Sequence, residues 1–131
     1  MQQSQRQAVD IVARVPDGAA LPAAMAAVDL ERAGPARALV QELAYGTLRH
    51  HGRLDALTRA LAQKPIVDRA VALLVEVALY QIAHTRMPAF AVVDQAVDAG
   101  AALGKPAARS LVNALLRRYL RERAALDARM E

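Results

Sequence analysis

Apolar residues recur every three or four positions between the proline and glycine residues that punctuate this sequence. Such spacing gathers them on one side of a helix, so it predicts amphipathic helices, and no stretch has the alternation typical of a strand. Of the 131 residues, 55% are hydrophobic but only 3% are aromatic. A core of alanine, leucine and valine suits closely packed helices better than a sheet. We therefore expect residues 1–131 to form one all-α domain, a compact bundle of about seven helices.

The breaks predict where the first four helices begin and end. Two helices are expected near residues 4–15 and 21–29. A third begins with Pro35 in its first turn. We expect Gly52 to separate the third helix from a fourth, which ends before Pro65 because the residue preceding a proline avoids the helical conformation.

The second half of the chain has clear boundary signals. Asp68 is the expected N-cap of a fifth helix, rich in leucine and valine, which we expect to be central. Pro88 begins a sixth helix, Gly104 is expected in the left-handed conformation at its end, and Pro106 begins the seventh. The final residues, 124–131, show no clear pattern, so we expect them to fray or to continue into a longer protein.

The aromatic side chains are few, and one of them precedes an informative glycine. Because glycine costs about 1 kcal/mol in the middle of a helix, Gly46 predicts the close approach of another helix. The aromatic residues are Tyr45, Tyr80, Phe90 and Tyr119. Surfaces that stack RNA bases usually expose several rings together, so we expect these four in the core and at interfaces instead.

The most informative segment is the seventh helix, within residues 103–123, LGKPAARSLVNALLRRYLRER. Its apolar residues share one broad arc of the helix, formed by Leu111, Val112, Leu115, Leu116 and Tyr119. Arg117, Arg118 and Arg121 fall on the opposite side. Residues 105–123 carry six basic side chains and one acidic side chain. One face of this helix can therefore be buried while the other binds an anion.

This concentration of positive charge predicts phosphate binding. The whole chain has a net charge of +4 and a pI of about 10.1, and its basic residues are mostly arginines, which make forked contacts to phosphate. The residues expected to contact RNA are Lys105, Arg109, Arg117, Arg118 and Arg121, extended by Arg6, Arg49 and Arg53. The alternative is a solvated surface, whose arginines reflect favourable charge at a helix C-terminus and the codon bias of a GC-rich genome.

Several classes of site are excluded or not expected. The sequence contains no cysteine, so it has no disulfide, thiolate nucleophile or cysteine metal site. It lacks a Gly-rich phosphate loop, a serine nucleophile motif and a catalytic carboxylate pair, so we expect neither an enzyme nor a bound cofactor. His50 and His51 diverge by about 100° on a helix and cannot share a metal ion without other ligands. Asp94 and Asp98 are expected on a solvated face. No signal peptide or membrane span is found, which predicts a cytoplasmic location.

Three segments in this order resemble the NusB-like domain family. They are LVQELAYGTLR at 39–49, VALYQIAHTRMPAFAVVDQAVDAG at 77–100, and the LGKP break with the helix that follows it. More narrowly, YGTLR, LGKP and LVNALLRRYLRE are similar to the amino-terminal domain of bacterial small-subunit rRNA 5-methylcytosine methyltransferases of the RsmB type. NusB, a transcription antitermination factor, usually has a segment like FVNGVLD in its last helix, and this segment ends in acidic residues. The corresponding segment of this chain, VNALLRR, ends in basic residues, which favours the methyltransferase branch.

The resemblance implies an all-helical domain that presents RNA to a separate catalytic domain using S-adenosylmethionine. That catalytic domain is absent from this chain. Methyltransferases of this type attack cytosine through a cysteine, so the resemblance implies binding and positioning rather than catalysis. Two positions depart from the family pattern. Ala107 replaces a tryptophan often found after GKP, and the arginine-rich amino terminus of NusB is reduced to Arg6.

Two functional hypotheses follow, and they differ in partner. The first is an RNA-binding accessory domain, whose partner is small-subunit rRNA and whose affinity depends steeply on salt. The second is a stand-alone NusB-like antitermination factor or protein-interaction module. Its apolar surface would dock a ribosomal protein, a transcription factor or the catalytic domain of its own full-length protein, and that binding would survive salt.

Overall fold

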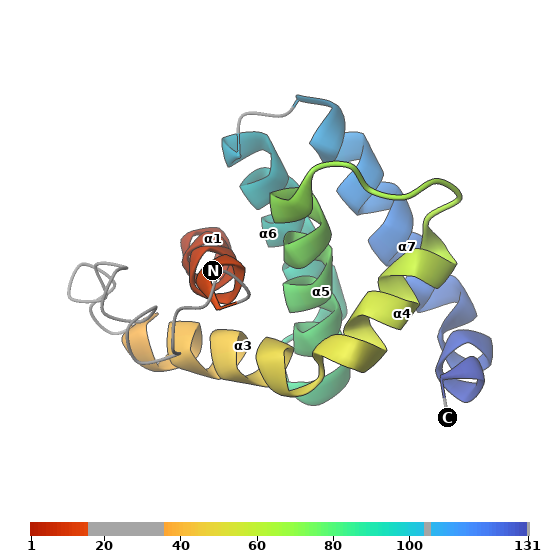
Figure 1. Ribbon diagram of the computed structural model, residues 1–131, viewed down its shortest axis with the longest axis horizontal. Coiled ribbons are helices and arrows are strands. Elements are labelled where there is room, and N and C mark those ends of the chain that lie inside the picture. Colours follow the sequence, from red (N-terminus) through yellow and green to blue (C-terminus); the bar gives the residue numbers. More distant parts are fainter. Residues whose placement is uncertain (16–35, 104–105, 131) are drawn as a thin grey trace.

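The computed structural model describes residues 1–15, 36–103 and 106–130, and all regular elements in these ranges are helices. The all-α prediction is therefore confirmed. The helices described are α1 (Gln2–Arg14), α3 (Arg37–Arg49), α4 (His51–Leu61), α5 (Arg69–His84), α6 (Ala89–Ala102) and α7 (Pro106–Arg129). Figure 1 shows α1 and α3 to one side of α5, and α4 and α7 to the other side. The predicted helix at 21–29 lies outside the described residues.

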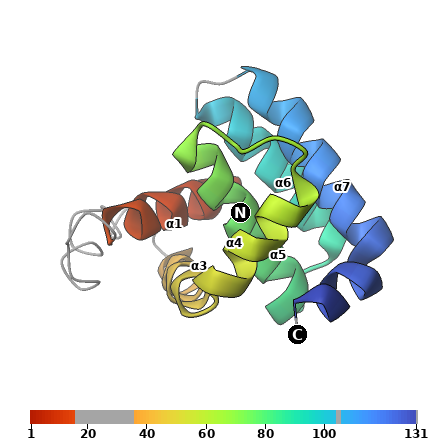
Figure 2. The ribbon, with the colours of Figure 1, turned by 45° about the vertical axis from the view of Figure 1, so that its right-hand side comes forward.

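Helix α5 is the centre of the bundle, as its sequence predicts. It packs against α1, α3, α4, α6 and α7, and the turned view in Figure 2 also places it between α1 and α7. Its residues from Leu73 to Leu79 are all buried. The predicted N-cap is confirmed, because the Asp68 side chain accepts a hydrogen bond of 3.2 Å from the Val71 amide. Such a cap satisfies one of the donors that the first helical turn leaves unpaired.

A buried amide pair joins α1 to α5. Gln5 Nε2 donates to Gln81 Oε1 over 2.8 Å, and both side chains are buried. The same Gln5 nitrogen donates a longer bond of 3.4 Å to the Val92 carbonyl of α6. Buried polar groups are costly without such partners, so this pair defines how α1 packs against α5.

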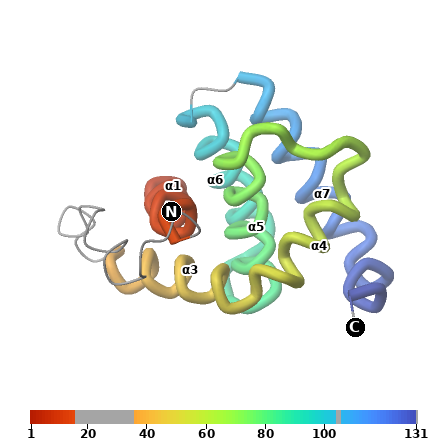
Figure 3. The backbone as a smooth tube through the Cα atoms, in the orientation of Figure 1, coloured from red at the N-terminus to blue at the C-terminus, as the bar shows by residue number. Residues whose placement is uncertain are grey.

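The boundary between α3 and α4 differs from the prediction. His50, not Gly52, separates the two helices, because its backbone (φ −105°, ψ 16°) departs from helical values. Gly52 lies in the first turn of α4, and a Cβ atom added there would contact nothing within 4 Å. The break therefore requires one residue of altered backbone and does not use the conformational freedom of glycine. The tube in Figure 3 shows the sharp change of direction from α3 to α4.

Close helix contact at Gly46 is confirmed. A Cβ atom added to Gly46 would lie 2.0 Å from Cζ of Tyr80, which is far inside van der Waals contact. The Tyr80 ring of α5 therefore occupies the space that any larger residue of α3 would fill. Glycine is required at position 46 by this ring and not by an unusual backbone conformation.

The C-terminal part of α7 differs from the prediction for residues 124–131. The helix continues to Arg129 with a kink at Glu122, whose backbone (φ −113°, ψ 17°) is not helical. Beyond the kink Leu126 is buried in the core, and the Tyr119 hydroxyl donates to Asp127 Oδ1 over 3.0 Å. Residues 124–129 are therefore helical and are held against the bundle through Leu126 and Asp127. Of the two expectations for this segment, fraying or continuation into a longer protein, fraying is wrong for these residues. The pattern was missed because one leucine in eight residues gives no helical period.

Candidate nucleic-acid interface

Helix α7 presents one buried face and one charged face, broadly as predicted. Val112, Leu115, Leu116 and Tyr119 are buried. Leu111 is the exception on the predicted apolar arc, since 37% of its surface is exposed. It lines a groove on the surface instead of the closed core.

Arg117 and Arg121 form the open part of the charged face. Arg117 donates from Nε to Asn113 Oδ1 over 2.9 Å, and this neutral partner leaves the positive charge uncompensated. Arg121 is exposed and makes no ion pair within the described part of the chain. The two guanidinium groups lie one helical turn apart, a spacing that suits successive phosphates better than a core contact.

Arg118 has a structural role that the sequence did not reveal. Its Nη1 donates to the Leu61 carbonyl over 2.8 Å, and its Nε donates to Glu122 Oε2 over 2.8 Å. Leu61 ends α4, so Arg118 satisfies one of the unpaired carbonyls at that helix terminus. The prediction that Arg118 lies on the open face with Arg117 and Arg121 is wrong, because a projection of α7 alone does not show its contact with the end of α4.

The remaining predicted residues do not form one continuous patch. Arg109 Nη2 lies 3.8 Å from Oδ1 of Asp98 on α6, so its charge is paired. Arg6 donates from Nε to Gln2 Oε1, and both residues lie on α1. Helix α1 packs against α3, α5 and α6, and α5 lies between α1 and α7 (Figures 1 and 2), so Arg6 is remote from the charged face of α7. Lys105 lies outside the described residues. The single extended patch expected from the sequence is therefore divided among several elements.

A second group of basic residues lies on the end of α3, on α4 and on the end of α7, and α4 contacts both of the other helices. Arg49 is exposed at the last residue of α3. Arg53 of α4 and Arg123 of α7 share one acidic partner, because each lies 3.5 Å from a carboxylate oxygen of Asp127. Arg123 also lies 5.7 Å from the centre of the Tyr119 ring. Two arginines therefore share one carboxylate.

Three rings stack beside this region, and we call them the ring cluster: His50, Tyr80 and His84. The His50 and His84 ring centres are 4.4 Å apart with 12° between the planes. Tyr80 lies 5.2 Å from His84 and 6.0 Å from His50, at 27° to both. His84 is exposed, whereas the other two are half-buried. Sequence analysis missed this cluster because its members come from two helices.

The environment of the ring cluster favours the neutral forms of His84 and Tyr80. Burial lowers the pKa of His84 below 6.5, and the positive charges of His50 and Arg53 lower it further. Burial also raises the pKa of the Tyr80 hydroxyl above 10.0. A neutral imidazole and a neutral phenol therefore face each other near neutral pH.

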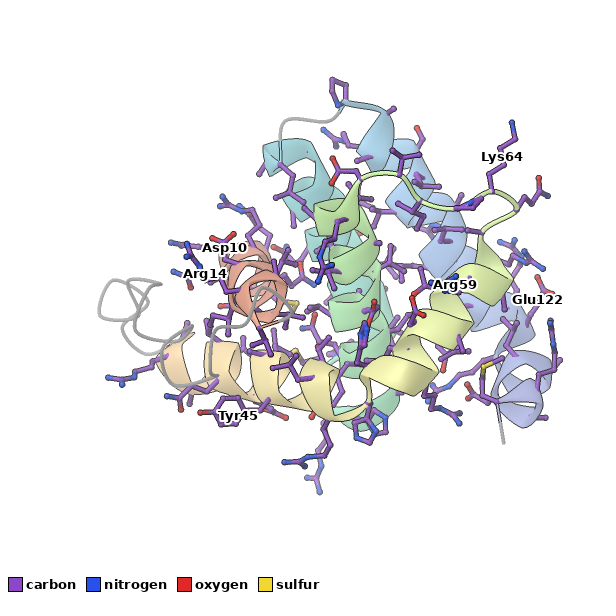
Figure 4. All side chains as sticks on the ribbon, in the orientation of Figure 1. Asp10, Arg14, Tyr45, Arg59, Lys64 and Glu122 are labelled. Carbon is purple, nitrogen blue, oxygen red and sulfur yellow. The ribbon has the colours of Figure 1, made fainter. Side chains whose placement is uncertain are left out.

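The other aromatic residues only partly follow the expectation. Tyr119 is buried in the core. Phe90 is 72% exposed at the start of α6, and Tyr45 is exposed on the outer side of α3 (Figure 4). The prediction of a core role is therefore confirmed for Tyr119 and for Tyr80, which packs partly buried against the core, whereas Tyr45 and Phe90 are exposed.

His51 lies apart from the ring cluster and is paired with a buried acid. Its Nδ1 lies 2.7 Å from Glu76 Oε1. Burial raises the pKa of Glu76 above 4.5, although the bond to His51 opposes this rise. His50 and His51 thus have different partners. Among the described residues, no group of three histidine or acidic side chains could hold a metal ion.

An apolar groove lies between the segment at residues 62–68 and α7. Its volume is about 840 Å³, and its floor includes Leu115 and Val71. Val67 is 99% exposed beside it. Lys64 and Arg121 border the groove, so an apolar surface has a basic edge. In Figure 4, Lys64 projects from this segment away from the bundle.

Comparison with known proteins identifies the fold family. A model of the NusB family matches residues 2–121 of the chain. The chain belongs to the NusB family. No helix in the described ranges has both the length and the hydropathy needed to cross a membrane.

The most informative relatives of this NusB-family chain are bacterial enzymes named ribosomal RNA small subunit methyltransferase B. The chain is 45% identical to the protein of Vibrio vulnificus over 92 residues, which are 69% of this chain and 22% of that protein. It is 46% identical to the Pseudomonas putida protein over 97 residues, 72% of this chain and 22% of that protein. It therefore spans about a fifth of the length of these relatives, and the matched part is their amino-terminal domain.

Proposed function

We propose that this NusB-family chain is a non-catalytic, cytoplasmic RNA-binding domain that positions small-subunit rRNA for cytosine methylation by a separate catalytic domain. The names of the relatives support the rRNA substrate. The absence of cysteine supports a non-catalytic role, because methyltransferases of this type attack the cytosine ring through a thiolate. S-adenosylmethionine would bind to the catalytic domain and not to this chain.

The observation that carries the proposal is the open face of α7. Arg117 and Arg121 keep uncompensated charges one turn apart, and Lys64 is exposed across the groove from Arg121. Contacts from such groups to phosphates release counterions and supply affinity without reading sequence. We therefore expect this face to follow the RNA backbone, while base recognition depends on other residues.

Fluorescence anisotropy with a structured small-subunit rRNA fragment, measured across a salt series, tests this proposal. The variant Arg117→Glu/Arg121→Glu should bind more weakly. Its slope of log K against log salt should also be shallower by about 1.5 to 2, since two phosphate contacts are lost. Arg118 is left unchanged because its bond to the Leu61 carbonyl joins α7 to α4.

A matched control applies the same change of charge elsewhere. Arg14→Glu/Arg37→Glu alters two exposed arginines on α1 and α3, on the other side of α5 from α7. This control should retain most of the affinity and slope. Equal losses in the two double variants would mean that net charge alone drives binding and would contradict the proposed surface.

A second candidate function is protein docking, and the apolar groove favours it. Exposed Val67 and partly exposed Leu111 give this surface an apolar character that phosphate binding does not require. The partner would be a ribosomal protein, a transcription factor or the catalytic domain of the full-length protein. Binding that is unchanged by salt and lost in Val67→Glu would favour this candidate, including a stand-alone antitermination role.

A further inference from the structure

The ring cluster of His50, Tyr80 and His84 has the composition of a base-binding site. We propose that it stacks an unpaired base of bound RNA, while Arg49 and Arg53 contact the flanking phosphates. This inference rests on the proposed RNA-binding function and adds a preference for single-stranded segments to it. Base pairing and stacking inside a duplex cover the faces of a base, so only an unpaired base can pack against the rings.

The backbone of α3 and α5 builds the cluster. Gly46 and His50 lie one turn apart on α3 and its cap, and Tyr80 and His84 lie one turn apart on α5. The missing side chain at Gly46 admits the Tyr80 ring, whose Cζ would lie 2.0 Å from a Cβ atom. With Tyr80 held there, His50 and His84 lie 4.4 Å apart with nearly parallel planes. At the lower edge of Figure 1, the junction of α3 and α4 meets the end of α5.

The surroundings of the ring cluster favour an anionic ligand with a neutral aromatic part. Arg53 and Arg123 act electrostatically on His84, and Arg49 acts on Tyr80. The opposing charges are Asp127, which both Arg53 and Arg123 approach at 3.5 Å, and Glu42. Cations therefore outnumber anions around the His84 and Tyr80 rings. This combination matches a nucleotide, whose phosphate is charged and whose base is not.

The exposure of His84 distinguishes the ring cluster from a core aromatic group. A core cluster would bury all three rings, but His84 is exposed and the other two are half-buried. The three ring centres lie at the corners of a triangle with sides of 4.4, 5.2 and 6.0 Å, so His84 is not enclosed between the other two rings. His84 also ends α5, so no further turn of that helix covers it. A base can reach this ring without rearrangement of the backbone.

The test measures binding of a single-stranded oligoadenylate of about ten nucleotides to the whole chain in a salt series. His84→Ala should weaken binding by about 5- to 150-fold, the range for loss of one stacked base, with an unchanged salt slope because no phosphate contact is removed. His84→Phe should restore most of the affinity. Phe90→Ala is the matched control, since it removes an exposed ring that has no partner rings or cations among the described contacts. Thermal melts verify that each variant is folded.

A second measurement needs no variant. Replacing the central adenosines by abasic nucleotides should weaken binding to the wild-type chain by a similar factor and leave the salt slope unchanged. If the wild-type chain binds RNA but neither His84→Ala nor the abasic positions weaken it, the stacking site is wrong and the proposed function stands. An equal loss in Phe90→Ala would also overturn the stacking site. If the wild-type chain binds no RNA, the proposed function fails and this inference fails with it.

Discussion

The two ends of α5 carry surfaces of opposite chemistry. At its beginning, the segment at residues 62–68 and α7 enclose an apolar groove whose floor is continuous with the core at Leu115. At its end, the ring cluster stands beside exposed arginines and depends on a glycine of α3. The first surface consists of core side chains that solvent can partly reach. The second consists of polar aromatic rings that stack on one another at the surface. Substitutions at the two ends should therefore have different consequences for stability and for binding.

The largest expected effect is loss of folding at the groove. Leu115→Asp places a carboxylate at a position that is 5% exposed, without any partner, and should lower the free energy of unfolding by about 4 kcal/mol. Urea denaturation measures this change. Leu111→Asp is the matched control on the same edge of the groove, where 37% exposure should limit the loss to about 1 kcal/mol. Equal effects at both positions would contradict the assigned inner face of α7.

A smaller effect is expected at the other end of α5, from a comparison of two glycines. Gly46→Ala must displace the Tyr80 ring, and the resulting strain should exceed the gain in helix propensity, for a net loss of about 1 to 2 kcal/mol. Gly52→Ala meets no atom within 4 Å in α4 and should stabilise the chain by about 0.5 to 1 kcal/mol. Thermal melts of the two variants give opposite shifts if the ring position is correct. A stabilised Gly46→Ala would show that Tyr80 does not lie against α3.

The smallest expected effect is a pH dependence at the ring cluster. The pKa of His84 is lowered from 6.5 first by burial, then by His50, Arg53 and Arg123, while Asp127 opposes the shift. The unfolded chain therefore binds this proton more tightly, and stability is lost as the pH falls from 6.5 through the lowered native pKa. Between about pH 7.5 and 5.5, the wild-type melting temperature should fall more than that of His84→Phe. Parallel curves for the two proteins would contradict the lowered pKa.

Features that depend on local sequence could be predicted, and these include most of the fold. The helical period, the Asp68 cap and the need for a close neighbour at Gly46 all follow from residues near one another in the chain. The break at His50 was misplaced to Gly52 because glycine is only one of several ways to end a helix. The buried Leu126 was missed because its packing partners are remote in sequence.

The candidate site was less predictable than the fold, for a related reason. The charge of α7 could be read from the sequence, and Arg117 and Arg121 are exposed as expected. However, a sequence does not show which cations are already engaged, so the bond from Arg118 to the Leu61 carbonyl could not be foreseen. The His50–His84 stack likewise depends on contact between α5 and the end of α3. His50 precedes α4 and His84 ends α5, so two helices lie between these histidines in the chain and no periodic pattern links them.

The buried bond between Gln5 and Gln81 has a consequence for the assembly of the bundle. Apolar contacts alone would allow α1 to shift along the axis of α5, since alanine and valine on α1 could pack against α5 in more than one axial position. The bond from Gln5 Nε2 to Gln81 Oε1 forms at only one of these positions, although Gln5 Oε1 has no partner among the described residues. A shift by one turn would also leave the Gln5 amide nitrogen and the Gln81 oxygen without this bond, at a cost of about 1 to 3 kcal/mol for each group. The glutamines thereby select a single axial register for a helix whose other contacts are nearly uniform. Gln5→Leu should accordingly preserve helicity while allowing α1 to adopt more than one alignment.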